Sequence, residues 1–353
     1  MHMEDFVRIP ALMEFGFEDL KREVVDRGLC SRCGTCAAFC DKIDISDKPK
    51  FRYEHDTVCG LCYTICPRTF ISMDHVERKI FERTRRDEEE YVGVFRKCYA
   101  VRRSDMLEHN GQDGGAVTAI LAYAIDKQII DCAVVTTCDE KKWRVSVKVA
   151  ADYDALCASA GTKYSIFPSV IGVKEAIEHG YSSIGFVGLP CQIQGLRIVQ
   201  TTEQPYDINQ DKIKLLIGLF CMENFSEEML DFIDKICPLE NVRKFDIKGR
   251  EMCIYGTDVH RVPLSEIEHF VGEGCLVCTD FASELADISV GSVGSPDGFS
   301  TVIVRTEEGE KLVNGAIHDG YIEAEEIKEE GLREIVKIAK LKRKRGREKE
   351  VRR

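Results

Sequence analysis

The 353-residue sequence has no long hydrophobic run and no excess of positive charge. Its longest apolar stretch, around Leu215 to Met222, is far shorter than the roughly 20 residues that a membrane-spanning helix needs. The first residues, Met1 to Asp5, lack the basic start and apolar run of a secretory signal peptide. A net charge of −12 argues against binding to nucleic acid. We therefore expect a cytoplasmic protein that would contact a membrane only through a partner.

Cysteine, in contrast, is abundant, with 17 residues in the chain. Outside a small secreted scaffold, this abundance indicates reduced thiols and metal binding. One run has the spacing C-x2-C-x2-C-x3-C and consists of Cys30, Cys33, Cys36 and Cys40. A second run has the same spacing and consists of Asp56, Cys59, Cys62 and Cys66, with Asp56 in place of its first cysteine. Two such runs in tandem are typical of a two-cluster bacterial-type ferredoxin and predict electron transfer.

In ferredoxins of this type, the fourth cysteine of each run binds the cluster of the other run. One 4Fe–4S cluster is therefore expected on Cys30, Cys33, Cys36 and Cys66. The other is expected on Cys40, Cys59, Cys62 and position 56. Because a carboxylate is a harder ligand than a thiolate, Asp56 could bind iron, leave a labile corner, or face solvent beside a 3Fe–4S cluster. A fourth alternative is that Asp56 is a loop residue and the site is incomplete.

The chain divides into five expected segments. Residues 1–27 form a helical segment, and 28–76 form the ferredoxin-like α+β domain. Residues 77–92 carry many charges and are expected to be a linker or an exposed helix. Residues 93–340 form the main domain, and 341–353 are a basic tail. We interpret this tail as a solvated, fraying helix end, in preference to a docking site for an acidic partner or an anionic surface.

The main domain alternates predicted strands and helices, which favours an α/β fold, a mixed sheet with helices on its faces. The pattern predicts helices over 114–128, 170–179, 191–200, 226–236 (with Ser226 as its N-cap), 309–318 and 330–340. It predicts strands over 131–137, 143–150, 183–187, 213–220, 287–291 and 301–305.

Four further cysteines lie in this domain at informative positions. Cys275 and Cys278 form a C-x-x-C pair, which is compatible with zinc, a redox dithiol or a cluster. Cys191 and Cys221 each follow a predicted strand, where ligand sites of α/β folds gather. Together the four would suffice for a third 4Fe–4S cluster, although spacing alone leaves open that they are buried, inert thiols.

Three loops of small residues are candidate cofactor sites. The first precedes a predicted helix, and a glycine-rich helix amino terminus suits a cofactor phosphate, although it is neither a Walker A nor a Rossmann motif. The second adds hydroxyl groups and one cation, and the third follows a short strand. The candidate residues are Gln112, Asp113, Gly114, Gly115 and Thr118; Gly161, Thr162, Lys163, Tyr164 and Ser165; and Gly294, Ser295 and Asp297.

Six motifs in order make the chain from about residue 93 to 340 resemble the β subunits of the coenzyme F420-reducing hydrogenase and dehydrogenase family. They are 112–115, 160–164, 189–192, 221–225, 275–278 and 292–298. The resemblance implies an α/β fold that carries FAD, a site for coenzyme F420, and a 4Fe–4S cluster on Cys191, Cys221, Cys275 and Cys278. It also implies that the turns at 114–118 and 161–165 contact FAD. The ferredoxin-like segment resembles that of the electron-input subunits of membrane F420H2 dehydrogenases.

The resemblance implies an F420-dependent oxidoreductase subunit in which electrons move between F420, FAD, three clusters and a partner. FAD would stand between the others because it exchanges both hydrides and single electrons. No side chain is predicted to be catalytic. The sequence suggests no nickel–iron, molybdopterin or sirohaem site, so the partner is expected in a hydrogenase, formate dehydrogenase, heterodisulfide reductase or F420H2 dehydrogenase type complex. Two alternatives stay open: a flavin and iron–sulfur reductase for another organic substrate, and a non-catalytic electron-wiring subunit.

Overall fold

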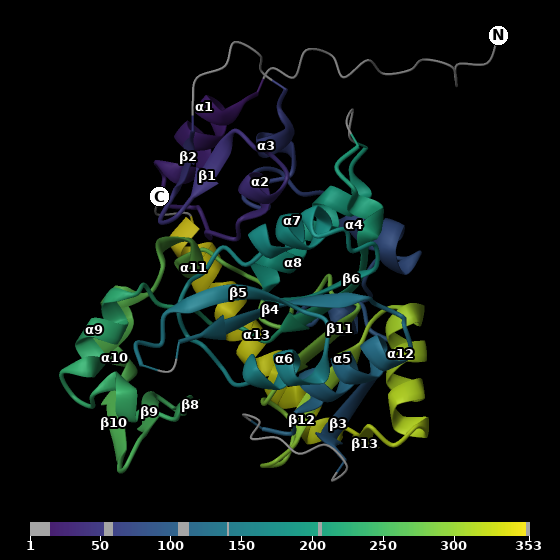
Figure 1. Cartoon of the computed structure of the whole chain (residues 1–353), viewed down its shortest axis with the longest axis vertical. Helices are drawn as coiled ribbons and strands as arrows, with labels where there is room; N and C mark the ends of the chain where they lie inside the picture. The colour runs from purple at the N-terminus through teal and green to yellow at the C-terminus, as the bar shows by residue number, and fades with distance from the viewer. Residues whose placement is uncertain (1–14, 53–58, 105–112, 140, 204–206, 351–353) are drawn as a thin grey trace.

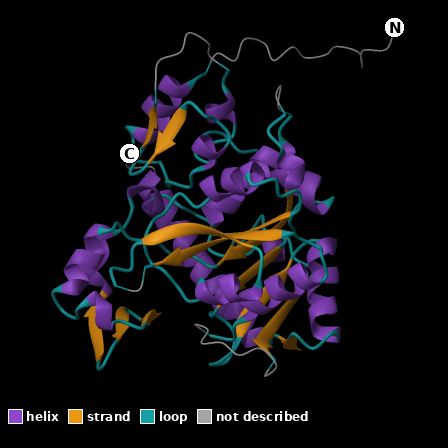
Figure 2. Ribbon diagram, in the orientation of Figure 1, coloured by secondary structure: helices purple, strands orange, loops and turns teal. Residues whose placement is uncertain are grey.

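An eight-stranded mixed sheet lies at the centre of the larger domain (Figures 1 and 2). The computed structural model describes residues 15–52, 59–104, 113–139, 141–203 and 207–350. The strand order is β13-β3-β12-β11-β7-β6-β4-β5, in which β4, β6, β7 and β11 are parallel and the other pairings are antiparallel. The strands are β3 (Lys97–Arg103), β4 (Cys132–Cys138), β5 (Val145–Ala150), β6 (Ile184–Gly188), β7 (Ile213–Leu219), β11 (Ile288–Gly291), β12 (Ser300–Val304) and β13 (Ile322–Glu326). The predicted α/β class is confirmed.

Helices cover both faces of this sheet because its strands are apolar on both sides. In β6, Val187 belongs to the core under α5 and α12, whereas its neighbour Phe186 belongs to the core under α7 and α8. The helices of this domain are α5 (Ala116–Asp126), α6 (Tyr153–Ala158), α7 (Ile171–Glu178), α8 (Pro190–Thr201), α12 (Glu307–His318) and α13 (Glu329–Glu350). Except for the last helix, every helix and strand predicted in the main domain begins and ends within two residues of its predicted bounds.

A smaller antiparallel sheet was not predicted from the sequence. It consists of β8 (Lys244–Lys248), β9 (Glu251–Tyr255) and β10 (Val259–Pro263) and packs against α9 (Glu228–Asp234) and α10 (Leu264–Ile267). The prediction that Ser226 caps α9 is wrong, because Glu227 occupies the N-cap position. Ser226 instead donates its backbone N–H to the Phe270 carbonyl, which fixes it in a loop before the helix begins.

The N-terminal cysteine-rich domain lies at one end of the molecule (Figure 1). Its buried residues form a small core that Val277 of the main domain joins. Its elements are α1 (Phe17–Leu20), a π-helical turn (Lys21–Val25), α2 (Thr35–Ala38), the hairpin β1 (Ile43–Ile45) and β2 (Pro49–Phe51), and α3 (Leu61–Thr64). The helix predicted before residue 28 is present, and its Phe17, Leu20 and Val24 are buried in this core. A Cβ on Gly195 of α8 would collide with Thr35, so α2 packs directly on the main domain.

The charged segment 77–92, expected to be a linker or an exposed helix, starts as a helix but buries two of its acidic side chains. It begins inside α4 (Met73–Phe81) and continues through a short 3-10 helix at Asp87–Glu89. Glu77 and Glu89 are buried, and each accepts hydrogen bonds from an arginine of the same segment: Arg85 bonds Glu77, and Arg83 bonds Glu89 at 2.6 Å. Opposite charges within the segment offset one another, which allows these two glutamates to be buried while the neighbouring Arg86 and Glu88 stay exposed.

The prediction of a separate basic tail from residue 341 is wrong, because residue 341 lies inside α13 (Glu329–Glu350). Lys342 is buried and donates to the Cys221 carbonyl. Arg343 pairs with Glu284 at 2.7 Å, and Arg345 pairs with Glu223 at 2.5 Å. These residues are neither a fraying end nor a free docking surface, because they bind acidic groups and a carbonyl of the main domain. Within the part of the chain that the structure describes, no helix combines the length and apolarity needed to cross a bilayer.

Candidate functional site

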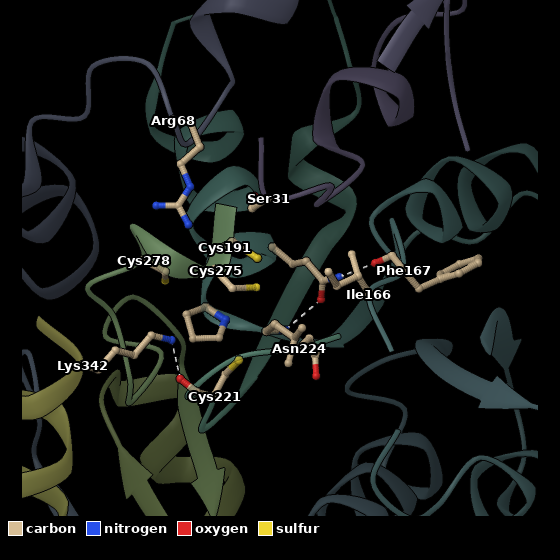
Figure 3. A pocket seen from close by; sticks show the side chains of 13 residues that line it. Ser31, Arg68, Ile166, Phe167, Cys191, Cys221, Asn224, Cys275, Cys278 and Lys342 are labelled. Carbon is tan, nitrogen blue, oxygen red and sulfur yellow. Dashed lines mark hydrogen bonds between the residues drawn. The ribbon is translucent and has the colours of Figure 1, made fainter. Parts of the chain in front are cut away.

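Four cysteines from three parts of the main domain line one cavity, which we call the main-domain cysteine site (Figure 3). Cys191 lies in the first turn of α8, directly after β6, and Cys221 follows β7. Cys275 belongs to the short helix α11 (Glu273–Leu276), and Cys278 follows it. Because β6 and β7 are parallel neighbours, their carboxyl ends meet at one edge of the sheet. Local spacing could not show this convergence.

Two cations point into the same cavity, Arg68 from the N-terminal domain and Lys342 from α13 (Figure 3). Burial opposes ionisation of the Cys278 thiol, but Lys342 and Arg68 outweigh it and lower the pKa of Cys278. Burial raises the pKa of Cys221 to about 12, and burial together with the nearby Cys33 raises the pKa of Cys191. Cysteines bind metals as thiolates, so a metal group in this cavity would gather several negative charges. The two cations would offset part of that charge.

The N-terminal domain also brings its ligand candidates together. A second cavity is lined by Cys30, Cys33, Cys36 and Cys66, the set that the crossing rule assigns to one cluster; we call it the first ferredoxin site. Cys40, Cys59 and Cys62, the second ferredoxin site, are also neighbours, since Cys40 and Cys59 both act to raise the pKa of Cys62 after the larger effect of burial. Asp56 lies outside the described residues.

The donor sets in these sites differ from those of a single-ion site. Among the described residues, no three His, Cys, Asp or Glu side chains converge on a point where one metal ion would fit. In a cubane cluster each of four thiolates binds its own iron, so its ligands surround a volume and do not meet at a point. The main-domain site and the first ferredoxin site each present four thiols around one cavity, which fits such a group.

The three small-residue loops gather near β8, an element that was not predicted. Partial desolvation raises the pKa of Asp113. Lys244 of β8 opposes this shift, and Asp246 of β8 and Asp297 of the third loop contribute to it, so these groups lie near one another. Tyr164 of the second loop is also close to Asp113 and Asp246, which raise its pKa after the larger effect of burial. Gln112 lies outside the described residues.

Within these loops the glycines determine the backbone path. Gly115 has φ +68° at the N-cap of α5, and a Cβ on Gly114 would collide with the Val101 carbonyl. Gly294 has φ +97° and packs on the backbone of Gly331, while Ser295 shares a 2.6 Å hydrogen bond with Thr301. Thr118 lies in the first turn of α5, half-buried.

The cation of the second loop is already bound within that loop. The Lys163 ammonium donates to the carbonyls of Ser159, Ala160 and Gly161, at 2.5, 2.9 and 3.0 Å. Burial lowers the pKa of Lys163 to about 8. Of its neighbours, Thr162 is half-buried, and Ser165 is buried and pairs with Phe225. Lys163 therefore supports the loop and, in this conformation, does not extend toward a phosphate.

Among the residues that line the site and that the sequence did not point to, three have a hydroxyl or a charge: Ser31, Arg68 and Lys342. Arg68 comes two residues after Cys66, and Ser31 lies between Cys30 and Arg32, so adjacency to ligand cysteines was the available signal. Lys342 had no such signal, because it lies in a run that resembles a solvated helix end.

Most of the main domain matches a known protein family. The matching family is described as coenzyme F420 hydrogenase/dehydrogenase, beta subunit: residues 98–172 match its N-terminal part, and residues 181–330 match its C-terminal part. The chain is 41% identical over 246 residues to the coenzyme F420 hydrogenase subunit beta of Methanothermobacter thermautotrophicus, covering 67% of this chain and 87% of that protein.

Two other relatives extend over the N-terminal domain as well. The coenzyme F420-dependent sulfite reductase of Methanocaldococcus jannaschii is 37% identical over 92% of this chain, which spans 50% of that protein. A subunit of the F(420)H(2) dehydrogenase of Methanosarcina mazei is 32% identical over 91% of both chains. A chain in a solved structure of the F420-reducing [NiFe] hydrogenase complex from Methanosarcina barkeri superimposes with a TM-score of 0.70 at 35% identity, covering 74% of this chain and 92% of that one.

Proposed function

Because the chain belongs to the family of coenzyme F420 hydrogenase/dehydrogenase beta subunits, we propose that it is an oxidoreductase subunit that moves electrons between coenzyme F420 and a redox partner. The observation that carries this proposal is the presence of three separate groups of cysteines in one chain, one in the main domain and two in the N-terminal domain. Relatives named as subunits of an F420 hydrogenase and of an F420H2 dehydrogenase support a place in a complex of several subunits.

The residues present suit three iron–sulfur clusters and one flavin. The main-domain cysteine site and the first ferredoxin site would each hold a 4Fe–4S cluster, and the second ferredoxin site would hold the third. The loops at 113–118, 161–165 and 294–297 would contact FAD and the F420 ring system. When bound, FAD would exchange hydrides with F420 and single electrons with the clusters.

The chain itself contributes position and charge. The sheet edge and α11 hold the four main-domain thiols around one cavity, and Arg68 and Lys342 offset the negative charge that these thiols acquire as ligands. The free N–H groups at the start of α5 offer a positive helix end to a cofactor phosphate. No side chain is required to move a proton in a hydride transfer, so we assign no catalytic residue.

Anaerobic purification followed by iron, flavin and activity assays tests this function. We expect about twelve irons per chain if all three clusters are cubanes, or about eleven if one is a 3Fe–4S cluster, together with FAD. We also expect reduction of a viologen dye by reduced F420. About four irons would show that the N-terminal sites are empty, and absence of flavin would favour a wiring subunit. Flavin without F420 activity would favour a reductase for another substrate.

A second prediction concerns position 56, where the tandem pattern has its one aspartate. Asp56→Cys should complete a four-thiolate second ferredoxin site and lower the potential of its cluster, because thiolate donates more charge to iron than carboxylate does. Electron paramagnetic resonance (EPR) during a redox titration measures this shift. An unchanged spectrum and potential would mean that position 56 does not bind iron.

A further inference from the structure

Ser31 and Arg68 lie in the wall between two cysteine sites. Both residues line the main-domain cysteine site, and both also line the first ferredoxin site. Arg68 has polar contacts on both sides of this wall. Its backbone N–H donates to the Cys66 sulfur at 3.4 Å, and its guanidinium donates to the Gly274 carbonyl at 3.3 Å, next to Cys275.

The ligand loops of these two sites also touch directly. A Cβ on Gly274 would collide with the carbonyl group of Cys30 and with the Cα of Ser31. Gly274 precedes Cys275, so its missing side chain allows a ligand loop of the N-terminal domain to lie on a ligand loop of the main domain. By contrast, Cys40, Cys59 and Cys62 line neither cavity.

Two polar atoms in this wall are buried without a hydrogen-bond partner among the described residues: Ser31 Oγ and Arg68 Nε. Both groups are donors, and leaving a buried donor unpaired costs stability. A group bound in these two cavities could supply the acceptors that Ser31 and Arg68 lack. The acceptors expected in cavities surrounded by cysteines are the sulfur atoms of iron–sulfur clusters, since hydrogen bonds to these sulfurs are a normal feature of cluster sites.

We propose that Ser31 and Arg68 form a hydrogen-bonding bridge between the main-domain cysteine site and the first ferredoxin site, which makes these two sites direct neighbours in the electron route and the second ferredoxin site the outer one. This inference rests on the proposed function, since it requires clusters in these sites. Arg68 acts as a positioning residue: its charge and donors stabilise the more negative, reduced state of both neighbouring clusters and so raise both potentials.

The test is an EPR-monitored redox titration of the purified full chain, with signals assigned by variants that remove one cysteine from each site. Arg68→Met should make reduction of both neighbouring clusters about tenfold less favourable, which is about 59 mV for a one-electron couple. The cluster of the second ferredoxin site should keep its potential. Arg68→Lys, which retains the charge and loses the planar fork, should restore part of both shifts. Ser31→Ala should lower at least one of the same two potentials.

Arg32→Met provides a matched control. Arg32 neighbours Ser31 in sequence and carries the same charge as Arg68, but its guanidinium pairs with Asp47 at 2.7 Å. It should leave the potential of the main-domain cluster unchanged. The inference is overturned if Arg68→Met shifts neither cluster, only one of the two, or the outer cluster as well. Should Arg68→Met lose a cluster, the Arg68→Lys titration decides by the same criteria, and a Ser31→Ala variant that lowers neither of the two potentials also overturns the inference. A wild-type protein without iron would instead contradict the proposed function.

Discussion

Cys278→Ser should leave the reduction of FAD by reduced F420 intact while stopping electron delivery to the partner. Cys278 is buried, and the two cations of the site favour its thiolate, so the main-domain cluster would lose a principal ligand. Changes to groups that merely support metal ligands commonly cost on the order of 10–100-fold in affinity or activity, and loss of a direct ligand should cost at least as much. Rapid mixing with reduced F420 should show the flavin bleaching while the N-terminal clusters stay oxidised.

Cys237→Ser is the matched control for this variant. Cys237 is as buried as Cys278, at 4% exposed against 6%, but it lies outside the three cysteine sites. Its sulfur donates a long hydrogen bond to the Pro238 carbonyl at 3.9 Å. This variant should transfer electrons normally. Normal electron delivery in Cys278→Ser, with its cluster shown to be absent by EPR, would refute the proposed route. Loss of FAD together with the cluster would make Cys278 a folding residue.

Of the variants considered for this protein, Glu284→Gln should lower the free energy of unfolding most. The Glu284 side chain is 3% exposed and accepts from Arg85 at 2.5 Å and from Arg343 at 2.7 Å, so it joins the segment after the N-terminal domain to α13. Removing its charge leaves Arg85 with Glu77 as its one remaining carboxylate partner and takes from Arg343 the carboxylate that it binds. Breaking a buried ion pair in this way costs about 3–5 kcal/mol. Chemical denaturation of variant and wild type measures the loss.

Glu88→Gln removes the same charge from an exposed pair in the segment 77–92, to which Glu284 binds through Arg85. Glu88 lies 3.9 Å from Arg86, and both side chains are more than two-thirds exposed. Exposed pairs contribute at most about 1 kcal/mol, so this variant should unfold almost like wild type. Hydrogen exchange adds a local measurement, since α13 should lose protection only in Glu284→Gln. Equal stability of the two variants would show that the buried network around Glu284 does not secure α13.

The structure places several predicted groups where sequence spacing could not. Cys191, Cys221 and the Cys275–Cys278 pair are far apart in the chain. The parallel order of β6 and β7 brings Cys191 and Cys221 to one edge of the sheet, and α11 brings the pair to the same cavity. Strand β8 of the small sheet lies near the candidate cofactor loops, although these segments are far apart in the chain, so sequence spacing could not show their proximity. Lys163 was predicted as a cation for a phosphate, and its ammonium is bound to its own loop.

By itself, the sequence determined the features that depend on neighbours in the chain. Ligand spacing in Cys30–Cys40 and Cys59–Cys66 is local, because a loop of a few residues must present its thiols together. The alternation of strands and helices is local too, because periodicity reports which face of each element is apolar. Only the tertiary structure decided whether the charged side chains around Arg85 and Arg343 are buried or exposed. Whether a charge lies in solvent or in the interior depends on an opposite charge that another part of the chain supplies, here Glu284.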